Sequence, residues 1–339
     1  MGTPTTDEAH VLNTWLESMH IGELRVMDAL AVVPLHSNSP SPELNYLTLP
    51  EAHAAGQVVV SEKPSATVPT LLVINRAALP ILILDGEEIV GGRQNRVVNT
   101  TLLVPAQSTF ELDVTCVEHG RWHLGLDETF APGETVYPTL RQHKAAQVAE
   151  SLTASGEPHA DQSAVWDEIA TTHQRRGTHS STQAIHDVYL ERGEVLRRAE
   201  HVLRYPAEEP VGVVAVVNGR AICADIFDRP ATLRTYWSSL VRSYALEAES
   251  PMAPGPDTNV HASAMRLLAS AVAASKRVFP SRGIGQDVRL IAPDVLGAAL
   301  VVHHQSAVHV ALFACNERRD GTSVSRPSAR VRRLRQASR

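Results

Sequence analysis

The stretch that decides the fold is PILILDGEEIVGGRQNRVVNTTLLV, residues 80–104. Its apolar run, Ile81 to Leu84, stops at Asp85-Gly86, a pair typical of a tight turn. Two acids, two glycines and a set of hydrogen-bond donors follow before a strand pattern resumes at Val97. Ordering so many polar side chains between hydrophobic strands is costly unless something binds them. We interpret the stretch as the rim of a site on a β scaffold; a solvated loop between two strands is the simpler alternative.

Short apolar runs separated by turn residues flank this stretch, and helical patterns dominate after Trp122. This succession predicts an α+β fold, with an antiparallel β-sandwich-like or barrel-like N-terminal part on which helices and additional β-hairpins pack. We expect a flexible leader with a short helix (1–20), a β-rich part carrying the main motifs (21–125), a helical part with two β-hairpins that shares its core (126–316), and a basic disordered tail (317–339).

Three hairpins are predicted from turn chemistry. Asn218-Gly219 between two apolar runs is the strongest short-range hairpin signal. Residues 105–108 turn a predicted strand at 97–104 into another at 109–118. A last hairpin joins 296–303 to 307–313.

Two helix starts have specific signals. Thr48 to Glu51 matches a capping box, with Pro50 in the first turn. Ser181-Thr182 is expected to cap a longer helix reaching Leu203, in which Gly193 weakens the middle by about 1 kcal/mol relative to alanine.

Composition limits the function classes. The chain has 339 residues, 43% of them hydrophobic, and a net charge of −6, so it is not a nucleic-acid binder by bulk electrostatics. It has no recognisable signal peptide and no apolar run long enough for a membrane span. Three isolated cysteines in apolar runs suggest reduced thiols and a cytoplasmic protein. The tail from Glu317 carries eight arginines, the one place where a nucleic-acid contact is conceivable.

The acids of the opening stretch are the first candidates for chemistry. Carboxylates serve as general acids, general bases or ligands of a divalent cation. The candidate catalytic residues are Glu87, Glu88 and, further along the chain, Glu118. Asp85 is a candidate ligand contact. Pairing of these acids with nearby arginines, as a purely structural role, is the alternative.

The donors that follow suit a phosphate, a carboxylate or a base edge. Gln94, Asn95 and Arg96 are therefore candidate ligand-binding residues. Gly91 and Gly92 allow a close backbone approach, but neither classical nucleotide-binding glycine motif occurs.

The segment CVEHGRW, residues 116–122, adds a second group of candidates. Arg121 is a candidate phosphate clamp beside Trp122, which has a flat ring for stacking, although a tryptophan is more often a core residue. A catalytic role for Cys116 is disfavoured, because a cysteine in an apolar strand is usually inert. Gln162 and Trp166 lie four residues apart, on one face of a predicted helix, and are expected to cover the β site. No cysteine–histidine array with zinc spacing appears, so no metal site is predicted, and the sequence does not identify a cofactor.

Four motifs occur together and in order: DGEEIVG (85–91), QNRVVN (94–99), CVEHGRW (116–122) and DQSAVWDE (161–168). In these motifs the chain resembles the bacterial ARG and Rhodanese-Phosphatase-superfamily-associated Protein domain family, where ARG stands for ADP-ribosylglycohydrolase. The similarity extends from about Ile21 to Phe313. The family is named for its association with ADP-ribose-processing enzymes and phosphatases, which implies a role in NAD-derived or RNA-repair metabolism.

Motifs and resemblance together predict binding, with or without hydrolysis, of an ADP-ribose-type or related phosphorylated nucleotide. A small phosphorylated ligand is then the expected partner, and no membrane partner is expected. Two alternatives stay open: a non-catalytic β-scaffold module for a protein or sugar partner, and a cupin-like metal enzyme. The residues are compatible with an enzyme or a binding protein, and no oligomeric state is predicted.

Overall fold

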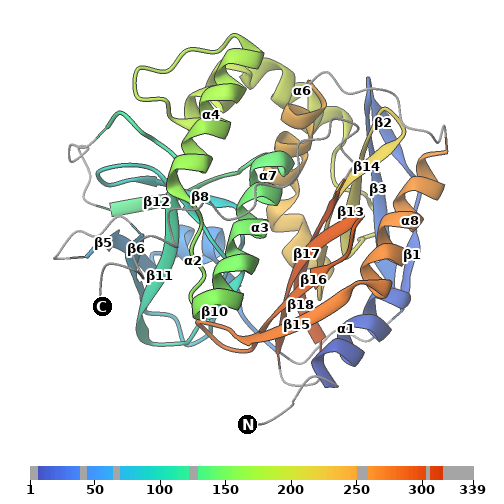
Figure 1. Ribbon diagram of the computed structural model, residues 1–339, viewed down its shortest axis with the longest axis horizontal. Helices are drawn as coiled ribbons and strands as arrows, with labels where there is room; N and C mark the ends of the chain where they lie inside the picture. The colour runs from blue at the N-terminus through green and yellow to red at the C-terminus, as the bar shows by residue number, and fades with distance from the viewer. Residues whose placement is uncertain are drawn as a thin grey trace, which may run out of the picture.

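The computed structural model describes residues 7–38, 44–63, 69–121, 129–249, 259–302 and 306–315. A β-barrel lies on the left of Figure 1 and a broad antiparallel sheet on the right. Helices α3 and α7 lie between these two β structures, and helices α1 and α8 cover the outer face of the sheet. Trp122, a candidate ligand contact, and the basic tail from Glu317 lie outside the described parts of the chain.

The barrel is closed by six strands in the order β11-β6-β5-β12-β8-β9. Alternation along β6, where every second side chain is buried, shows why the barrel forms: one face of each strand fills the interior and the other faces out. Its core includes Val73, Ile89, Val114 and Phe130. The barrel strands are β5 (Val58–Glu62), β6 (Thr70–Asn75), β8 (Glu87–Gly91), β9 (Arg96–Val98), β11 (Ser108–Cys116) and β12 (Thr129–Thr135).

The opening stretch also supplies a small sheet beside the barrel. Strand β7 (Ile81–Ile83) pairs antiparallel with β10 (Leu102–Val104) and parallel with β4 (Leu47–Thr48). All six side chains of β7 and β10 are buried, so the stretch enters and leaves through the protein interior. That burial fixes the position of the polar segment between them.

The large sheet has the order β1-β3-β13-β14-β18-β17-β16-β15, with β2 paired to β3. It combines N-terminal strands with strands from the second half of the chain. These strands are β1 (Met19–Ile21), β2 (Arg25–Met27), β3 (Leu30–Ser37), β13 (Gly212–Val217), β14 (Arg220–Phe227), β15 (Ser275–Pro280), β16 (Gln286–Ile291), β17 (Val295–Val302) and β18 (Ser306–Ala314).

Each face of the large sheet has its own core. The outer face packs on α1 and α8, while the inner face shares a cluster with α3, α7, Leu84 just after β7 and the barrel residue Val97. The helices are α1 (Asp7–Glu17), α2 (Leu49–Ala54), α3 (Pro138–Ser155), α4 (Gln162–Arg176), α5 (Ile185–Glu191), α6 (Gly193–Val202), α7 (Pro230–Ala248) and α8 (Val260–Ala273). None of the helices in the described parts of the chain combines the length and apolarity needed to cross a membrane.

The predicted α+β fold with an antiparallel barrel is confirmed. The Thr48–Glu51 capping box is present at the start of α2, and the Asn218-Gly219 turn joins β13 to β14. The hairpin predicted between 97–104 and 109–118 is wrong: the first segment splits into β9, which pairs with β11, and β10, which pairs with β7. Asn99, between the two strands, donates a side-chain hydrogen bond to the carbonyl of Pro158, a residue far along the chain.

The helix predicted from residue 181 to Leu203 is also divided. Helices α5 and α6 meet at Arg192, next to Gly193, where the weak helix former allows the break. Helix α5 begins at Ile185, and its N-cap residue, Ala184, makes no side-chain cap. The expected capping hydroxyl of Thr182 instead donates to a carboxylate oxygen of Glu118.

Candidate functional site

The three adjacent acids of the opening stretch point into three different environments. Asp85 forms an ion pair with Lys144 on α3. Glu87 accepts hydrogen bonds from the Leu84 amide and the Tyr236 hydroxyl. Glu88 faces the opposite way, toward α5. Because the Asp85-Gly86 turn reverses the chain, and successive strand residues then alternate, the three carboxylates do not converge.

Glu88 meets a histidine that lies nearly a hundred residues later. Its Oε2 is 3.2 Å from Nδ1 of His186, in the first turn of α5. The Glu88 side chain is 0% exposed and that of His186 is 30% exposed. The hydrogen bond with Glu88 raises the pKa of His186 and outweighs the opposing effect of burial. The buried carboxylate of Glu88 therefore holds the partly exposed imidazole ring of His186.

Glu118 and Arg121 form the second charged pair of this region. Arg121 donates from Nε to Glu118 Oε1 at 2.9 Å and from Nη2 to Oε2 at 2.7 Å, a two-point contact. Arg121 is 26% exposed and Glu118 only 5%. Burial alone would raise the pKa of Glu118, but hydrogen bonds from Arg121, Asn95 and Thr182 outweigh it and lower that pKa.

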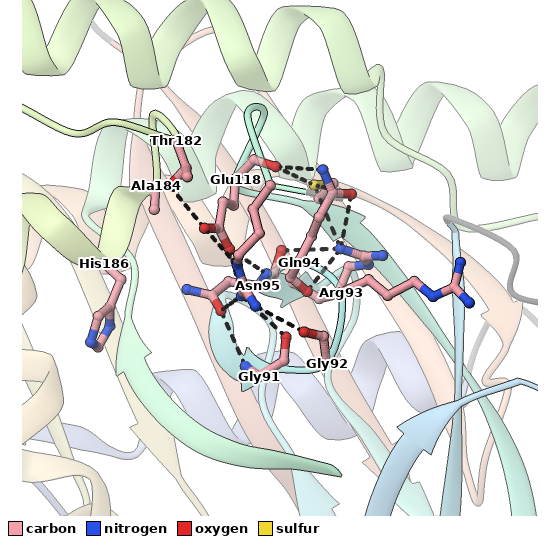
Figure 2. Close-up of polar contacts among 12 residues, drawn as sticks. Gly91, Gly92, Arg93, Gln94, Asn95, Glu118, Thr182, Ala184 and His186 are labelled. Atoms are coloured by element: carbon pink, nitrogen blue, oxygen red, sulfur yellow. Dashed lines mark hydrogen bonds and ion pairs between the residues drawn. The ribbon is translucent and has the colours of Figure 1, made fainter. Parts of the chain in front are cut away.

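Asn95 joins the two pairs. Its side-chain Nδ2 donates to Glu88 Oε1 at 3.4 Å, its backbone N–H donates to Glu118 Oε2, and its Oδ1 accepts from Arg121. Figure 2 shows Asn95 between the glycine loop and Glu118, with Thr182, Ala184 and His186 on the neighbouring segment. We name this set the rim cluster: Glu88, Asn95, Glu118, Arg121, Thr182 and His186.

The barrel places the rim cluster at one end. Strand β8 ends at Gly91, β9 begins at Arg96, and Arg96 is paired with Cys116, the last residue of β11. The loop between β8 and β9 packs closely, since a side chain at Gly92 (φ 49°) would collide with the ring of Phe130. Three strand ends thus converge on the polar residues, as expected for a site carried by loops on a rigid scaffold.

Gln94 and Arg96, both predicted to contact a ligand, lie inside the framework. Arg96 is 1% exposed and donates to the Gln94 carbonyl, and Gln94 donates to the Glu118 carbonyl. The thiol of Cys116 is buried beside them, and burial raises its pKa. These buried side chains hold the backbone around the β8–β9 loop through hydrogen bonds and do not reach solvent.

Helix α4 covers the end of β11, as its sequence pattern predicts. The amide of Gln162 makes two hydrogen bonds with the Cys116 backbone, at 2.8 and 2.6 Å, and so continues the strand's bonding pattern. Trp166 packs against the ring of His119, with centroids 4.2 Å apart. Gln162 therefore attaches the helix to the barrel through both of its polar atoms.

Asp85 belongs to a second charged group, which is enclosed. Lys144 bonds Asp85 and the Asn99 carbonyl; Arg141, one turn earlier on α3, forms a two-point ion pair with Asp225 at 2.9 and 2.6 Å. We name this set, with every member less than 10% exposed, the sealed cluster: Asp85, Thr101, Arg141, Lys144, Asp225, Tyr244 and His309.

His309 completes the sealed cluster. Its Nδ1 is 2.8 Å from the Thr101 hydroxyl and its Nε2 is 3.2 Å from Asp225. Burial would raise the pKa of Asp225, but Arg141 and His309 outweigh it and lower that pKa. The cluster ties the turn before β8 and the residue before β10 to α3 and the large sheet.

The sequence interpretation missed His186, Thr182 and Lys144. His186 is one of sixteen histidines, and no spacing rule links it to Glu88. The Ser-Thr pair at 181–182 was a visible signal, but it suggested a helix cap. Lys144 carried no signal, because a lysine in a helix is normally exposed.

The loop before α5 also borders a cavity of about 480 Å³, lined by Ala170, His173, Thr178, His179, Ser180, Ser181 and Gln183. Thr182, between two of these residues, bonds Glu118, so one loop serves both the cavity and the rim cluster. Across the described ranges, three or more histidine, cysteine or acidic side chains nowhere gather in a way that would hold a metal ion.

A comparison with protein families gives one match: the ARG and Rhodanese-Phosphatase-superfamily-associated Protein domain matches residues 18–313, nearly the whole chain. No significant match was found among curated proteins or among solved structures.

Proposed function

We propose that this chain, which belongs to the ARG and Rhodanese-Phosphatase-superfamily-associated Protein domain family, binds a small phosphorylated ligand of the ADP-ribose type at the rim cluster. One observation carries the proposal. Two partly exposed side chains that donate hydrogen bonds, Arg121 and His186, are each fixed by a buried carboxylate, and both carboxylates are bonded to Asn95. Preorganised donors of this kind suit an anionic ligand, because little side-chain freedom is lost on binding.

The donors available to a phosphate can be named. Arg121 uses its Nε–H, one Nη1–H and both Nη2–H groups on Glu118, Gly92 and Asn95. Of the five guanidinium N–H groups, this leaves the second Nη1–H. His186 uses Nδ1 on Glu88, which leaves Nε2 for a ligand. The loop that carries Thr182 also lines a cavity of about 480 Å³, which lies within the size range of small-molecule sites.

The proposal places the protein in the cytoplasm, where the thiols of Cys116 and Cys223 would stay reduced. A non-catalytic module for a protein or sugar partner is the second candidate. It is favoured by the internal bonding of Gln94, Arg96 and Gln162, which leaves these side chains to the framework.

Isothermal titration calorimetry tests the proposal with ADP-ribose, ADP-ribose 1″-phosphate and NAD on the wild type, Arg121→Lys and Arg198→Lys. Arg121→Lys keeps the charge but loses the two-point contact, so weaker binding is expected. Arg198 pairs with Asp28 at the surface and serves as the control. Absence of heat with all three ligands on the wild type contradicts the proposal. A stable protein partner recovered in a pull-down would then favour the non-catalytic binding module.

A further inference from the structure

We propose that His186 is the general acid of a phosphomonoester hydrolysis at the rim cluster, with Glu88 as its positioning residue. The inference rests on the binding site proposed above and adds a reaction to it. It starts from a geometry that the binding proposal alone does not need. A histidine bonded through Nδ1 to a buried carboxylate is fixed in orientation, so its Nε2 is presented in one direction.

Four other ionisable groups of this region are unsuited to proton transfer. Arginine does not lose its proton in proteins, which excludes Arg121 as an acid. Glu118 has both oxygens bonded, to Arg121, Asn95 and Thr182. Cys116 and Glu87 are buried away from the surface. Among the described residues of this region, His186 combines an exposed ring with an oriented proton.

The electrostatic surroundings favour the protonated ring. The hydrogen bond and the charge of Glu88 raise the pKa of His186, and the carboxylates of Glu134 on β12 and Asp187 on α5 act in the same direction. Desolvation opposes them but does not prevail. A general acid needs its proton near neutral pH, so the shift has the useful sign.

The step is a simple displacement. A water oxygen forms a bond to phosphorus while the bond from phosphorus to the leaving oxygen breaks, and the leaving oxygen takes the proton from Nε2 of His186. The attacking water loses one proton to solvent, from which the neutral imidazole is reprotonated. Arg121 would face the phosphoryl oxygens. The products are an alcohol and inorganic phosphate, with no change in oxidation state.

Phosphate release from two substrates tests the role of His186. A ribose hydroxyl leaves poorly without a proton, whereas p-nitrophenolate leaves readily without one. His186→Ala should therefore lower kcat on the order of 100-fold with ADP-ribose 1″-phosphate and much less with p-nitrophenyl phosphate. His201→Ala, an exposed histidine on α6, should leave both rates unchanged. Equal losses with both substrates would overturn the general-acid role.

Glu88→Gln tests the positioning role. Since loss of the carboxylate charge lowers the pKa of His186, the alkaline limb of the kcat profile should move to lower pH; a limb that stays in place overturns this role. If Glu88→Gln does not fold, the substrate comparison with the partly exposed His186 still decides. Calorimetric binding of ADP-ribose 1″-phosphate without phosphate release by the wild type refutes the hydrolysis alone. Absence of binding refutes the proposed function as well.

Discussion

The rim cluster and the sealed cluster are built from the same residue types but differ in exposure. Each has carboxylates, an arginine and a histidine joined by hydrogen bonds. At the rim, Arg121 is 26% and His186 30% exposed. In the sealed cluster Arg141 and His309 are each 1% exposed. The difference teaches that charge composition alone does not identify a site: the enclosed group joins α3 to the large sheet, and the open one has atoms left for a ligand.

Removing one partner of the sealed cluster should have the largest effect. Arg141→Met removes the two-point ion pair of Asp225 and leaves this buried carboxylate with only Tyr244 and His309, which is expected to cost about 3–5 kcal/mol of unfolding free energy. Arg198→Met, which breaks the exposed pair with Asp28, should cost less than about 1 kcal/mol. Urea denaturation measures both, and similar small losses would erase the contrast between enclosed and exposed pairs.

Glu87 should produce the next largest effect, and the size of this effect depends on pH. Burial raises its pKa from 4.5 to about 8. Between these two pH values the folded state holds a proton that the unfolded state has released. The contribution of Glu87 to the unfolding free energy is therefore fully present below pH 4.5 and is lost as pH rises through about 8.

Glu87→Gln keeps the shape without the charge. It should stabilise the protein by about 3 kcal/mol at pH 7 and by nearly nothing at pH 4, measured by denaturation at each pH. The same difference at both values would show that Glu87 is ionised in the folded protein.

Gln162 should have a moderate effect, because its two hydrogen bonds attach α4 to the end of β11. Gln162→Ala is expected to cost about 2 kcal/mol, since each bond contributes about 1 kcal/mol. Gln174→Ala, at an exposed position of the same helix, is the matched control. Thermal melting of both variants gives the comparison, and equal melting temperatures would exclude this attachment role.

The rim cluster should show the smallest effect on stability and the largest on ligand binding. His186→Ala removes a partly exposed side chain, and the buried Glu88 keeps its bond to Asn95 and has a pKa raised by burial, so it can take a proton; a loss of about 1 kcal/mol is expected. The same variant should weaken binding of ADP-ribose by at least about tenfold, by calorimetry, because it removes one of two preorganised donors. A strongly destabilised variant with unchanged affinity would move His186 from the site to the framework.

Local chemistry made much of the fold predictable. The capping box at Thr48 and the Asn218-Gly219 hairpin follow from short-range rules, and both are present. The pairing of β10 with β7 rather than β11 was not predictable, because short-range turn signals do not tell which apolar strand a buried segment will pair with.

The candidate site was predictable only in part. Glu88, Asn95, Glu118 and Arg121 are found together, as the motifs suggested, and their partner His186 comes from a segment whose pairing with them is a tertiary contact. Asp85 and Glu87 were grouped with Glu88 by sequence proximity. The turn at Gly86 and the alternation of β8 send them elsewhere.

The central claim, that a ligand meets the molecule at the rim and not at the sealed cluster, is tested most directly by histidine NMR. ADP-ribose is titrated into the protein while the imidazole resonances of His186 and His309 are followed, each assigned by its alanine or asparagine variant. The account predicts a saturable shift of the His186 signals with those of His309 unchanged. Saturable binding that leaves His186 unshifted would contradict it.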